Sequence, residues 1–362
     1  MKFLSVCSGI EAASVAWHPL GWESVAYSEI DPFPCKVLQH HYPNVPNLGD
    51  MTKFKEWLDA DVNVFVGGTP CQSFSVAGLR KGLDDPRGNL MLTYLAIAKR
   101  YRPNWLVWEN VPGVLSSADG RDFGSLLGGL AILGYGFAYR VLDAQYFGVA
   151  QRRRRVFVVG YLGNWRPAAA VLFERHSLQG HPAPSREKGK AVAVSTSASP
   201  VYGGSDPNTS DTVTSKWAKG SGGPAGNECG LFVAQPIAFS GQMSNPQTDV
   251  DMTQTLGAKN PMAVAVSSGH GWWSESDGTA QTLRAQDLIT KADTLPIVGM
   301  AVRRLTPVEC ERLQGFPDKY TDIQPNGKQT PDGPRYKALG NSMAVPVMAW
   351  IGKRIQTVDA LL

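Results

Sequence analysis

Cysteine is scarce in this sequence, and metal-binding patterns are missing. The 362 residues contain five cysteines, and no two of them stand in the C-x-x-C spacing of zinc or redox sites. The six histidines are also scattered without ligand spacing. An odd number of isolated cysteines argues against a disulfide framework, so we expect free thiols in a reducing compartment and no metal site.

Long apolar runs and a strong net charge are missing too. No run approaches the roughly 20 apolar residues that cross a bilayer, and the N-terminus, MKFLSVCSGIEAAS, lacks the basic start of a secretory signal. We therefore expect a soluble, cytoplasmic protein without a membrane partner. The net charge of +4 permits an acidic partner such as nucleic acid but does not require one.

Short β-branched or apolar runs alternate with helical patterns over residues 1–161. The runs that favour strands are KFLSVC, ESVAYS, VNVFVGG, NWLVWENV, FAYRVL and RVFVVGY. Such alternation is typical of an α/β fold with a mostly parallel sheet. Ligands of these folds bind outside the carboxyl ends of the strands, so we expect the site there.

Local signals mark three helices. The segment DDPR, residues 84–87, suits a helix start and places residues 67–84 in a loop. The segment TPVE, residues 306–309, has the spacing of a capping box. The segment NSMAVPVMAWIGKRI, after Gly340, predicts a terminal helix.

The composition divides the chain. Residues 176–300 are rich in Gly, Ser, Thr, Asn and Pro and loosely repeat a phrase, which favours short strands, turns or loops. We therefore expect a first domain over residues 1–164, a smaller domain over 165–334, and a C-terminal helix over 335–362 that returns to the first domain.

One cysteine stands in an unusual loop. In GGTPCQSFS, Gly67 and Gly68 allow close approach of a ligand to the backbone, and Pro70 stiffens the turn before Cys71. A lone cysteine is more often a small buried hydrophobe, and on this loop alone packing and chemistry are equally good interpretations of Cys71.

Two further segments carry charges beside predicted strands. In WENVPGVL, Glu109 lies at the end of an apolar strand. Its side chain either faces the crevice or is a solvated surface residue. In QRRRRVFVVG, four arginines run into a strand, and alternate positions face the same way. Arg153 and Arg155 therefore point to one site, unless the run is a plain basic surface.

Five segments follow one another along the chain: GGTPCQSFSVAG, ENVPGVL, AQYFGVAQRRRRVFVVG, RRLTPVECERLQGFPD and YKALGNSMAVPV. Over residues 1–161 and 302–355 they resemble the cytosine-5 DNA methyltransferase family of bacteria and phages. The resemblance implies a Rossmann-like α/β sheet that binds S-adenosyl-L-methionine and a smaller, mostly β or irregular target-recognition domain. It also implies that the target base is extruded from the DNA helix.

The resemblance implies a catalytic role for each matching residue. Cys71 is the thiolate that adds to carbon 6 of cytosine, which makes carbon 5 a nucleophile for the methyl group. Glu109 supplies a proton or hydrogen bond at ring nitrogen 3. Arg153 and Arg155 hold the ring carbonyl and the carboxylates in place.

The resemblance also implies cofactor and DNA contacts. Glu29 matches the acid at the ribose hydroxyls, and Asp50 matches the acid at the adenine amino group. The full cofactor set is Cys7, Ser8, Gly9, Ile10, Glu29, Ile30, Asp50, Met51, Pro70, Leu90, Asn341 and Ser342, and the DNA set is Gln72, Ser75, Arg87 and Gln151.

The N-terminal loop departs from the family pattern of an aromatic residue followed by two or three glycines. Cys7 stands at the aromatic position, Gly9 is kept, and Glu11 and Ala12 stand at the other glycine positions.

Three alternatives compete with DNA methylation. The substrate is RNA in a related branch, but the PCQ segment and the long variable region favour DNA. A catalytically idle DNA-binding module would keep the fold, yet Cys71, Glu109 and the paired arginines are intact. A dehydrogenase is disfavoured because no GxGxxG follows the first strand. We expect a monomer that acts on double-stranded DNA, with a cognate restriction enzyme as a possible partner.

Overall fold

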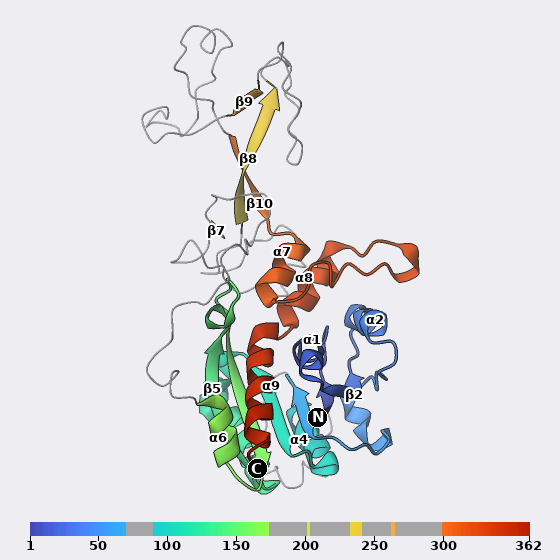
Figure 1. Cartoon of the computed structure of the whole chain (residues 1–362), viewed down its shortest axis with the longest axis vertical. Helices are drawn as coiled ribbons and strands as arrows, with labels where there is room; N and C mark the ends of the chain where they lie inside the picture. Colours follow the sequence, from blue (N-terminus) through green and yellow to red (C-terminus); the bar gives the residue numbers. More distant parts are fainter. Residues whose placement is uncertain (70–89, 174–200, 203–231, 241–261, 265–298) are drawn as a thin grey trace. The chain divides into compact units, whose positions relative to one another are not determined.

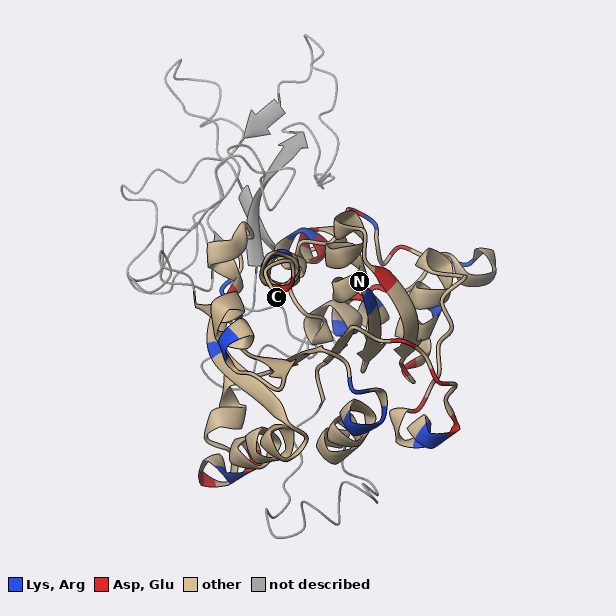
Figure 2. Ribbon diagram, turned by 60° about the horizontal axis from the view of Figure 1, so that its bottom comes forward, with Lys and Arg blue, Asp and Glu red and all other residues tan. Residues whose placement is uncertain are grey.

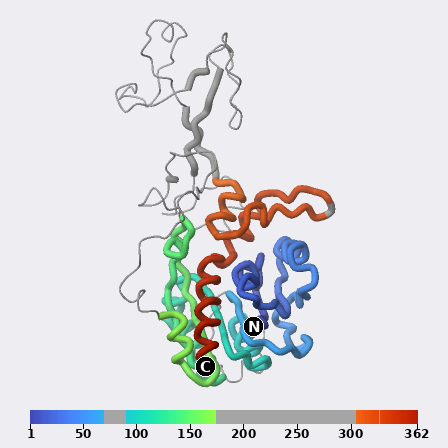
Figure 3. Tube along the Cα trace, viewed as in Figure 1, coloured from blue at the N-terminus to red at the C-terminus, as the bar shows by residue number. Residues whose placement is uncertain are grey.

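The computed structural model describes residues 1–69, 90–173 and 299–362, together with short strands at 201–202, 232–240 and 262–264. Five predicted site residues lie outside the described residues: Pro70, Cys71, Gln72, Ser75 and Arg87. The helix start predicted at residues 84–87 also lies outside them. The chain divides into two units, and the larger one contains both termini (Figure 3).

The larger unit is built on a six-stranded sheet with the order β2-β1-β3-β4-β6-β5 (Figure 1). The pairs from β2 to β4 are parallel, and β6 is antiparallel to both β4 and β5. The strands are β1 (Lys2–Val6), β2 (Glu23–Ser28), β3 (Val64–Gly67), β4 (Trp105–Asn110), β5 (Tyr135–Asp143) and β6 (Arg154–Leu162). The predicted α/β class with a mostly parallel sheet, and all six predicted strands, are confirmed.

Helices cover both faces of this sheet. Strand β4 is buried along its whole length, as expected for a strand covered on both sides. Its Leu106 and Trp108 belong to a core shared with α4 and α5, whereas Trp105 Nε1 donates to Asp359 Oδ1 of α9 at 2.8 Å. The helices are α1 (Ala12–Trp17), α2 (Pro32–His41), α4 (Leu90–Tyr101), α5 (Arg121–Ile132), α6 (Arg166–Leu172), α7 (Pro307–Gln314), α8 (Asp332–Asn341) and α9 (Val345–Asp359).

The C-terminal helix α9 packs against α1 and α6, so the end of the chain completes the layer begun at the N-terminus. Trp17 Nε1 donates to the carbonyl of Met348 at 2.8 Å and ties α1 to α9. The predicted terminal helix is therefore confirmed. Short 3-10 turns link the elements: η1 (His18–Leu20), η2 (Met51–Glu56), η4 (Pro112–Leu115), η5 (Ser117–Gly120), η6 (Ala144–Phe147) and η9 (Pro325–Gly327).

The predicted capping box at the start of α7 is also confirmed. Thr306 Oγ1 accepts the backbone N–H of Glu309, and the Glu309 carboxylate accepts the backbone N–H of Thr306. Pro307 occupies the first turn, where its missing N–H costs nothing. Gly315, with φ 80°, ends the helix in the left-handed conformation that glycine adopts readily.

The described part of the second unit consists of strands: β7 (Val201–Tyr202), β8 (Phe232–Ser240), β9 (Met262–Val264) and β10 (Gly299–Arg304). All their pairings are antiparallel, with β8 between β10 and β7 and β9 paired to β8. The boundaries predicted at residues 164 and 334 stay a prediction.

Within the described ranges, no helix is long and apolar enough to cross a membrane. In the ribbon of Figure 2, the Lys and Arg positions of these ranges are spread over several helices and loops, interspersed with Asp and Glu positions.

Candidate active site

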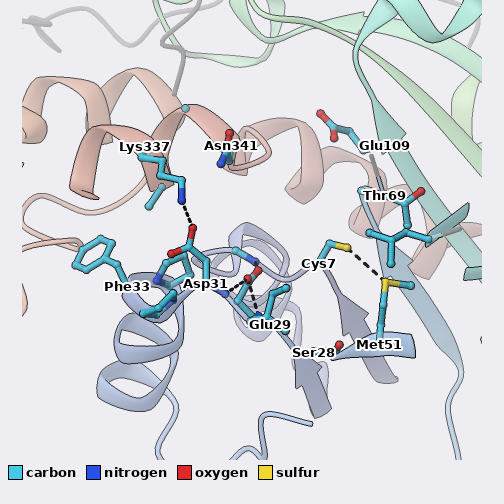
Figure 4. A pocket seen from close by; sticks show the side chains of 18 of the residues that line it. Cys7, Ser28, Glu29, Asp31, Phe33, Met51, Thr69, Glu109, Lys337 and Asn341 are labelled. Carbon is cyan, nitrogen blue, oxygen red and sulfur yellow. Dashed lines mark hydrogen bonds and ion pairs between the residues drawn. The ribbon is translucent and has the colours of Figure 1, made fainter. Parts of the chain in front are cut away.

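A cavity of about 900 Å³ opens where β1, β2, β3 and β4 end. Each strand contributes residues just past its carboxyl end, and α8 adds Lys337 and Asn341 (Figure 4). The sequence places small or charged residues at these ends, including Gly9, Glu29 and Glu109. The crevice predicted for an open α/β sheet is therefore present.

Glu29 organises the side of the cavity formed by the first two strands. Its Oε2 accepts the backbone N–H of Gly9 at 2.7 Å, and its Oε1 accepts those of Ile30 and Asp31 at 2.8 and 2.7 Å. One carboxylate thus joins the loop after β1 to the loop after β2. Ile30 lines the same cavity and is 71% exposed, which leaves an apolar surface open to a ligand.

Residues after the loop at 47–49 complete this side. Asp50 Oδ1 accepts the backbone N–H of Thr52 at 2.9 Å and so starts η2. Cys7 Sγ lies 3.5 Å from Met51 Sδ, and burial raises the pKa of the Cys7 thiol to about 12. A protonated thiol and a thioether give this wall an apolar, polarisable character.

The loop after β1 has an uncommon backbone. Cys7, Gly9 and Glu11 have φ values of 49°, 56° and 61°, in the left-handed region that costs non-glycine residues about 1 kcal/mol or more. The Glu11 carboxylate accepts hydrogen bonds from the Ser5 hydroxyl and from the backbone and hydroxyl of Ser14. These bonds offset the strain and explain how Glu11 occupies a position where the family pattern has glycine.

Glu109 and Arg155 face each other on the opposite side. Arg155 Nε lies 3.1 Å from Glu109 Oε1, and the two side chains are 15% and 11% exposed. Burial raises the pKa of Glu109, while the charges of Arg155 and Arg153 oppose that rise. Such a carboxyl is balanced between a charged form that pairs with arginine and a neutral form that can donate a hydrogen bond.

Arg153 connects this side to the C-terminal segment. Its guanidinium donates to the carbonyls of Gly340 and Ser342, at 3.1 and 2.6 Å. The side chain is 3% exposed, whereas Arg154 is exposed, so the alternation expected for this arginine run is present. Arg153 thereby holds Asn341 at the cavity.

The end of β3 is fixed by β4. Trp108 Nε1 donates to Thr69 Oγ1 at 3.0 Å, and Asn110 Nδ2 donates to the Thr69 carbonyl at 2.8 Å. A Cβ on Gly68 would lie 3.1 Å from Glu109 Oε2, so glycine leaves room for this carboxylate. Successive side chains of β4 point in opposite directions. Trp108 and Asn110 therefore bond to Thr69, whereas Glu109 faces the arginines.

A second cavity of about 40 Å³ adjoins the first and shares Cys7, Gly9, Gly68, Glu109 and Asn341 with it. Ser8 and Ser342, both predicted at the cofactor, line this smaller cavity. Most of the described predicted residues line the larger one: Cys7, Gly9, Glu29, Ile30, Asp50, Met51, Leu90, Glu109, Arg153, Arg155 and Asn341.

Two predicted residues line neither cavity. Ile10 is fully buried, and its carbonyl accepts a hydrogen bond from the Tyr320 hydroxyl at 2.9 Å. Gln151 is also fully buried, and its side-chain amide has no hydrogen-bond partner in the part of the chain that the structure describes.

Sequence reasoning missed several cavity residues, among them three with large or charged side chains. Asp31 and Phe33 lie on the loop after β2 and at the start of α2, and Lys337 on α8 forms an ion pair with Asp31 (Figure 4). A signal was available for Asp31, which follows Glu29 in the same loop. None marked Lys337, because its partner is about 300 residues away. Among the described residues, no group of His, Cys, Asp or Glu could hold a metal ion.

Comparison with models of known protein families identifies the family of this chain. The model of the family described as C-5 cytosine-specific DNA methylase matches residues 1–357. The chain belongs to this family.

Relatives in the DNA methylase family include phage and bacterial proteins. A DNA N-6-adenine-methyltransferase of Escherichia phage P1 is 37% identical over 97% of this chain, which spans 60% of that protein's length. The type II methyltransferase M2.BsuMI of Bacillus subtilis strain 168 is 27% identical, over 98% of this chain and 75% of the relative. M.SsoII of Shigella sonnei is 29% identical, over 99% and 81%.

Solved structures show the methylase fold at lower identity. The Entamoeba histolytica methyltransferase EhMeth has a TM-score of 0.55 and 15% identity, and covers 100% of this chain and 99% of its own. The Dnmt2 methyltransferase of S. pombe has a TM-score of 0.55 and 16% identity, and covers 99% and 98%. At these identities the likeness shows the fold.

Proposed function

We propose that the protein transfers a methyl group from S-adenosyl-L-methionine to carbon 5 of cytosine in a specific sequence of double-stranded DNA. The observation that carries this proposal is the buried Glu109 and Arg155 pair, which lies in one cavity with the acid-bearing loops of β1 and β2. Family membership gives the reaction class, and these groups supply the chemistry it needs.

The nucleophile in this proposal is Cys71. Carbon 5 of cytosine is a poor nucleophile, and addition of a thiolate at carbon 6 makes the ring enamine-like. Thr69 lines the cavity and precedes Cys71 by two positions, which supports delivery of the thiol to a base extruded from the duplex. The cycle ends when the proton leaves carbon 5 and the re-formed ring double bond expels the thiolate.

Glu109 is the group that activates the base. A neutral Glu109 donates a hydrogen bond to ring nitrogen 3 as the thiolate adds, and burial favours that neutral form. Arg155 stays cationic beside it and is free to hold the ring carbonyl once Glu109 is neutral. Arg153, bonded to Gly340 and Ser342, positions the surrounding backbone.

The loops after β1, β2 and at Asp50 fit the methyl donor. Glu29 and Asp50 suit hydroxyl and amino groups, and carboxylates at this place would repel the phosphates of a dinucleotide. The wall of Cys7, Met51 and Ile30 suits an apolar ring face. When bound, S-adenosyl-L-methionine supplies an electrophilic methyl on a sulfonium. Asn341 and Ser342 complete the proposed set from the C-terminal side.

Recognition of the DNA sequence is assigned to residues 165–334, with Gln72, Ser75 and Arg87 as DNA contacts near the base. Gln151, the fourth residue expected to contact DNA, is fully buried and is left out of this assignment. In this proposal the protein acts as a cytoplasmic monomer, with or without a cognate restriction enzyme.

A second candidate product is N6-methyladenine, because the relative from phage P1 is named as an adenine methyltransferase. Methylation of an exocyclic amine requires no thiolate, so the segment around Cys71 favours cytosine. The test is incubation with isotopically labelled S-adenosyl-L-methionine and, in separate reactions, mixed-sequence DNA or RNA, followed by mass spectrometry of the nucleosides. Labelled 5-methylcytosine supports the proposal; labelled N6-methyladenine alone contradicts it, and label on RNA but not DNA favours the RNA branch.

A further inference from the structure

The smaller cavity lies between Glu109 and a second buried acid. Ser5 and Glu11 line one part of it, and Gly68, Glu109 and Asn341 line another. Its volume of about 40 Å³ has room for about two or three water molecules. Since Glu109 lines both cavities, the smaller one adjoins the place where the base reacts.

Glu11 is 1% exposed and does not line the larger cavity. Its carboxylate accepts a hydrogen bond from the Ser14 hydroxyl. Ser14 Oγ lies 2.8 Å from the Tyr27 hydroxyl, which donates to Ser24 Oγ at 2.8 Å. A chain of hydroxyl groups therefore leads away from Glu11.

This chain ends at the surface. Ser24 Oγ lies 2.7 Å from Nε2 of His18, and His18 is exposed. Every link between Glu11 and the imidazole is a hydroxyl that can donate one hydrogen bond while it accepts another. The series thus has the composition of a path for protons.

Methyl transfer to carbon 5 releases one proton for each methyl group added. That proton must leave a site whose larger cavity holds both the base and the methyl donor. We propose that the smaller cavity, Glu11 and the hydroxyl series to His18 form the exit path for this proton. The proposal rests on the proposed function.

The steps balance. The bond between carbon 5 and hydrogen breaks, its electron pair re-forms the ring double bond, and the thiolate leaves. The proton passes through water in the smaller cavity to the Glu11 carboxylate. Glu11 returns it through Ser14, Tyr27 and Ser24 to His18, which releases it to solvent.

The electrostatics of the end groups agree with this path. Burial, with a smaller contribution from the charge of Glu29 just after β2, raises the pKa of Glu11 to about 7 against the opposing effect of its hydrogen bonds from Ser5 and Ser14, so the carboxyl exchanges protons near neutral pH. Tyr27, on β2, has a raised pKa and conducts as a neutral hydroxyl. Burial lowers the pKa of His18, which favours a neutral imidazole able to accept a proton.

The test uses His18, because its exposed side chain can be changed with little effect on the core. His18→Gln keeps a hydrogen-bonding group for Ser24 but cannot accept the proton. We expect its single-turnover rate of formation of free 5-methylcytosine, which includes loss of the carbon 5 proton and release of Cys71, to be roughly tenfold lower than that of the wild type, with unchanged affinity for S-adenosyl-L-methionine. Added imidazole should restore the rate. His40→Gln, at another exposed histidine, is the matched control and should show neither effect.

The variant Glu11→Gln tests the buried end of the proposed proton path independently. It keeps the shape of the side chain and should slow formation of free 5-methylcytosine without any response to imidazole, because the defect lies before His18. A wild-type rate in His18→Gln, or a loss that imidazole leaves unchanged, would overturn the exit path. The wild type in the same assay reports on the proposed function separately: no 5-methylcytosine from it would contradict that function and not the path alone.

Discussion

Arg155 Nε lies 3.1 Å from Glu109 Oε1, and each side chain is largely buried. A buried pair of this kind is costly to break from one side, because the remaining charge is left without compensation. Arg155→Met should therefore lower the free energy of unfolding by roughly 3 kcal/mol, measured by urea denaturation. In the double variant with Glu109→Gln, most of that loss should be recovered. Equal losses in the single and double variants would show that the pair is not coupled.

The arginine run allows a buried side chain to be compared directly with its neighbours in the sequence. Arg153 is buried and bonded to Gly340 and Ser342, whereas Arg154 is exposed. Arg153→Ala should reduce the rate of methyl transfer by roughly 100-fold and weaken binding of the methyl donor, because the backbone beside the cavity loses its anchor. Arg152→Ala and Arg154→Ala should stay within about threefold of the wild type. Similar losses in all three purified variants would refute the assigned roles.

Glycine at position 68 makes room for the carboxylate of Glu109. An alanine Cβ there would lie 3.1 Å from Glu109 Oε2 and 3.4 Å from Met343 Cε, so the carboxylate must shift. Gly68→Ala should slow methyl transfer roughly tenfold while the fold is kept. Gly124→Ala is the control, since its Cβ would meet nothing within 4 Å. A Gly68→Ala protein as active as Gly124→Ala would contradict the close approach.

Glu11 should make stability depend on pH. Its pKa in the folded state, about 7, lies above its ordinary value, so the folded protein holds this proton more tightly than the unfolded chain. Stability is then highest below the ordinary pKa and falls as the pH rises to about 7, by roughly 3 kcal/mol at most from this group. Unfolding of Glu11→Gln between pH 5 and 8, compared with the wild type, should lack that part of the fall. Parallel curves for the two proteins would argue against a buried, titrating Glu11.

The sheet could be predicted because its signals are local. Runs such as VNVFVGG and NWLVWENV are short, apolar and bounded by turn residues, and both form strands. The position of β6 between β4 and β5 has no such signal, because strand order depends on contacts between distant segments. The same holds for α9, whose contacts with α1 join the two ends of the chain.

Site residues could be predicted from the sequence where a charged residue stands directly beside an apolar strand. Glu29 and Glu109 follow apolar strands, and both line the cavity. The loop after β1 was harder, because three left-handed residues turn Ile10 into the core and bury Glu11. Gln151 shows the same limit: its alternation with Arg153 is visible in the sequence, but its complete burial depends on the packing around β6.

The most direct test of the account is covalent capture on DNA in which cytosine is replaced by 5-fluorocytosine, because fluorine at carbon 5 blocks the final elimination. With S-adenosyl-L-methionine present, denaturing electrophoresis should show a protein band shifted by covalently attached DNA, and Cys71→Ser should abolish it. A Cys71→Ser protein that still forms the adduct, or a wild type that makes 5-methylcytosine without any adduct on the fluorinated DNA, would contradict the proposed mechanism.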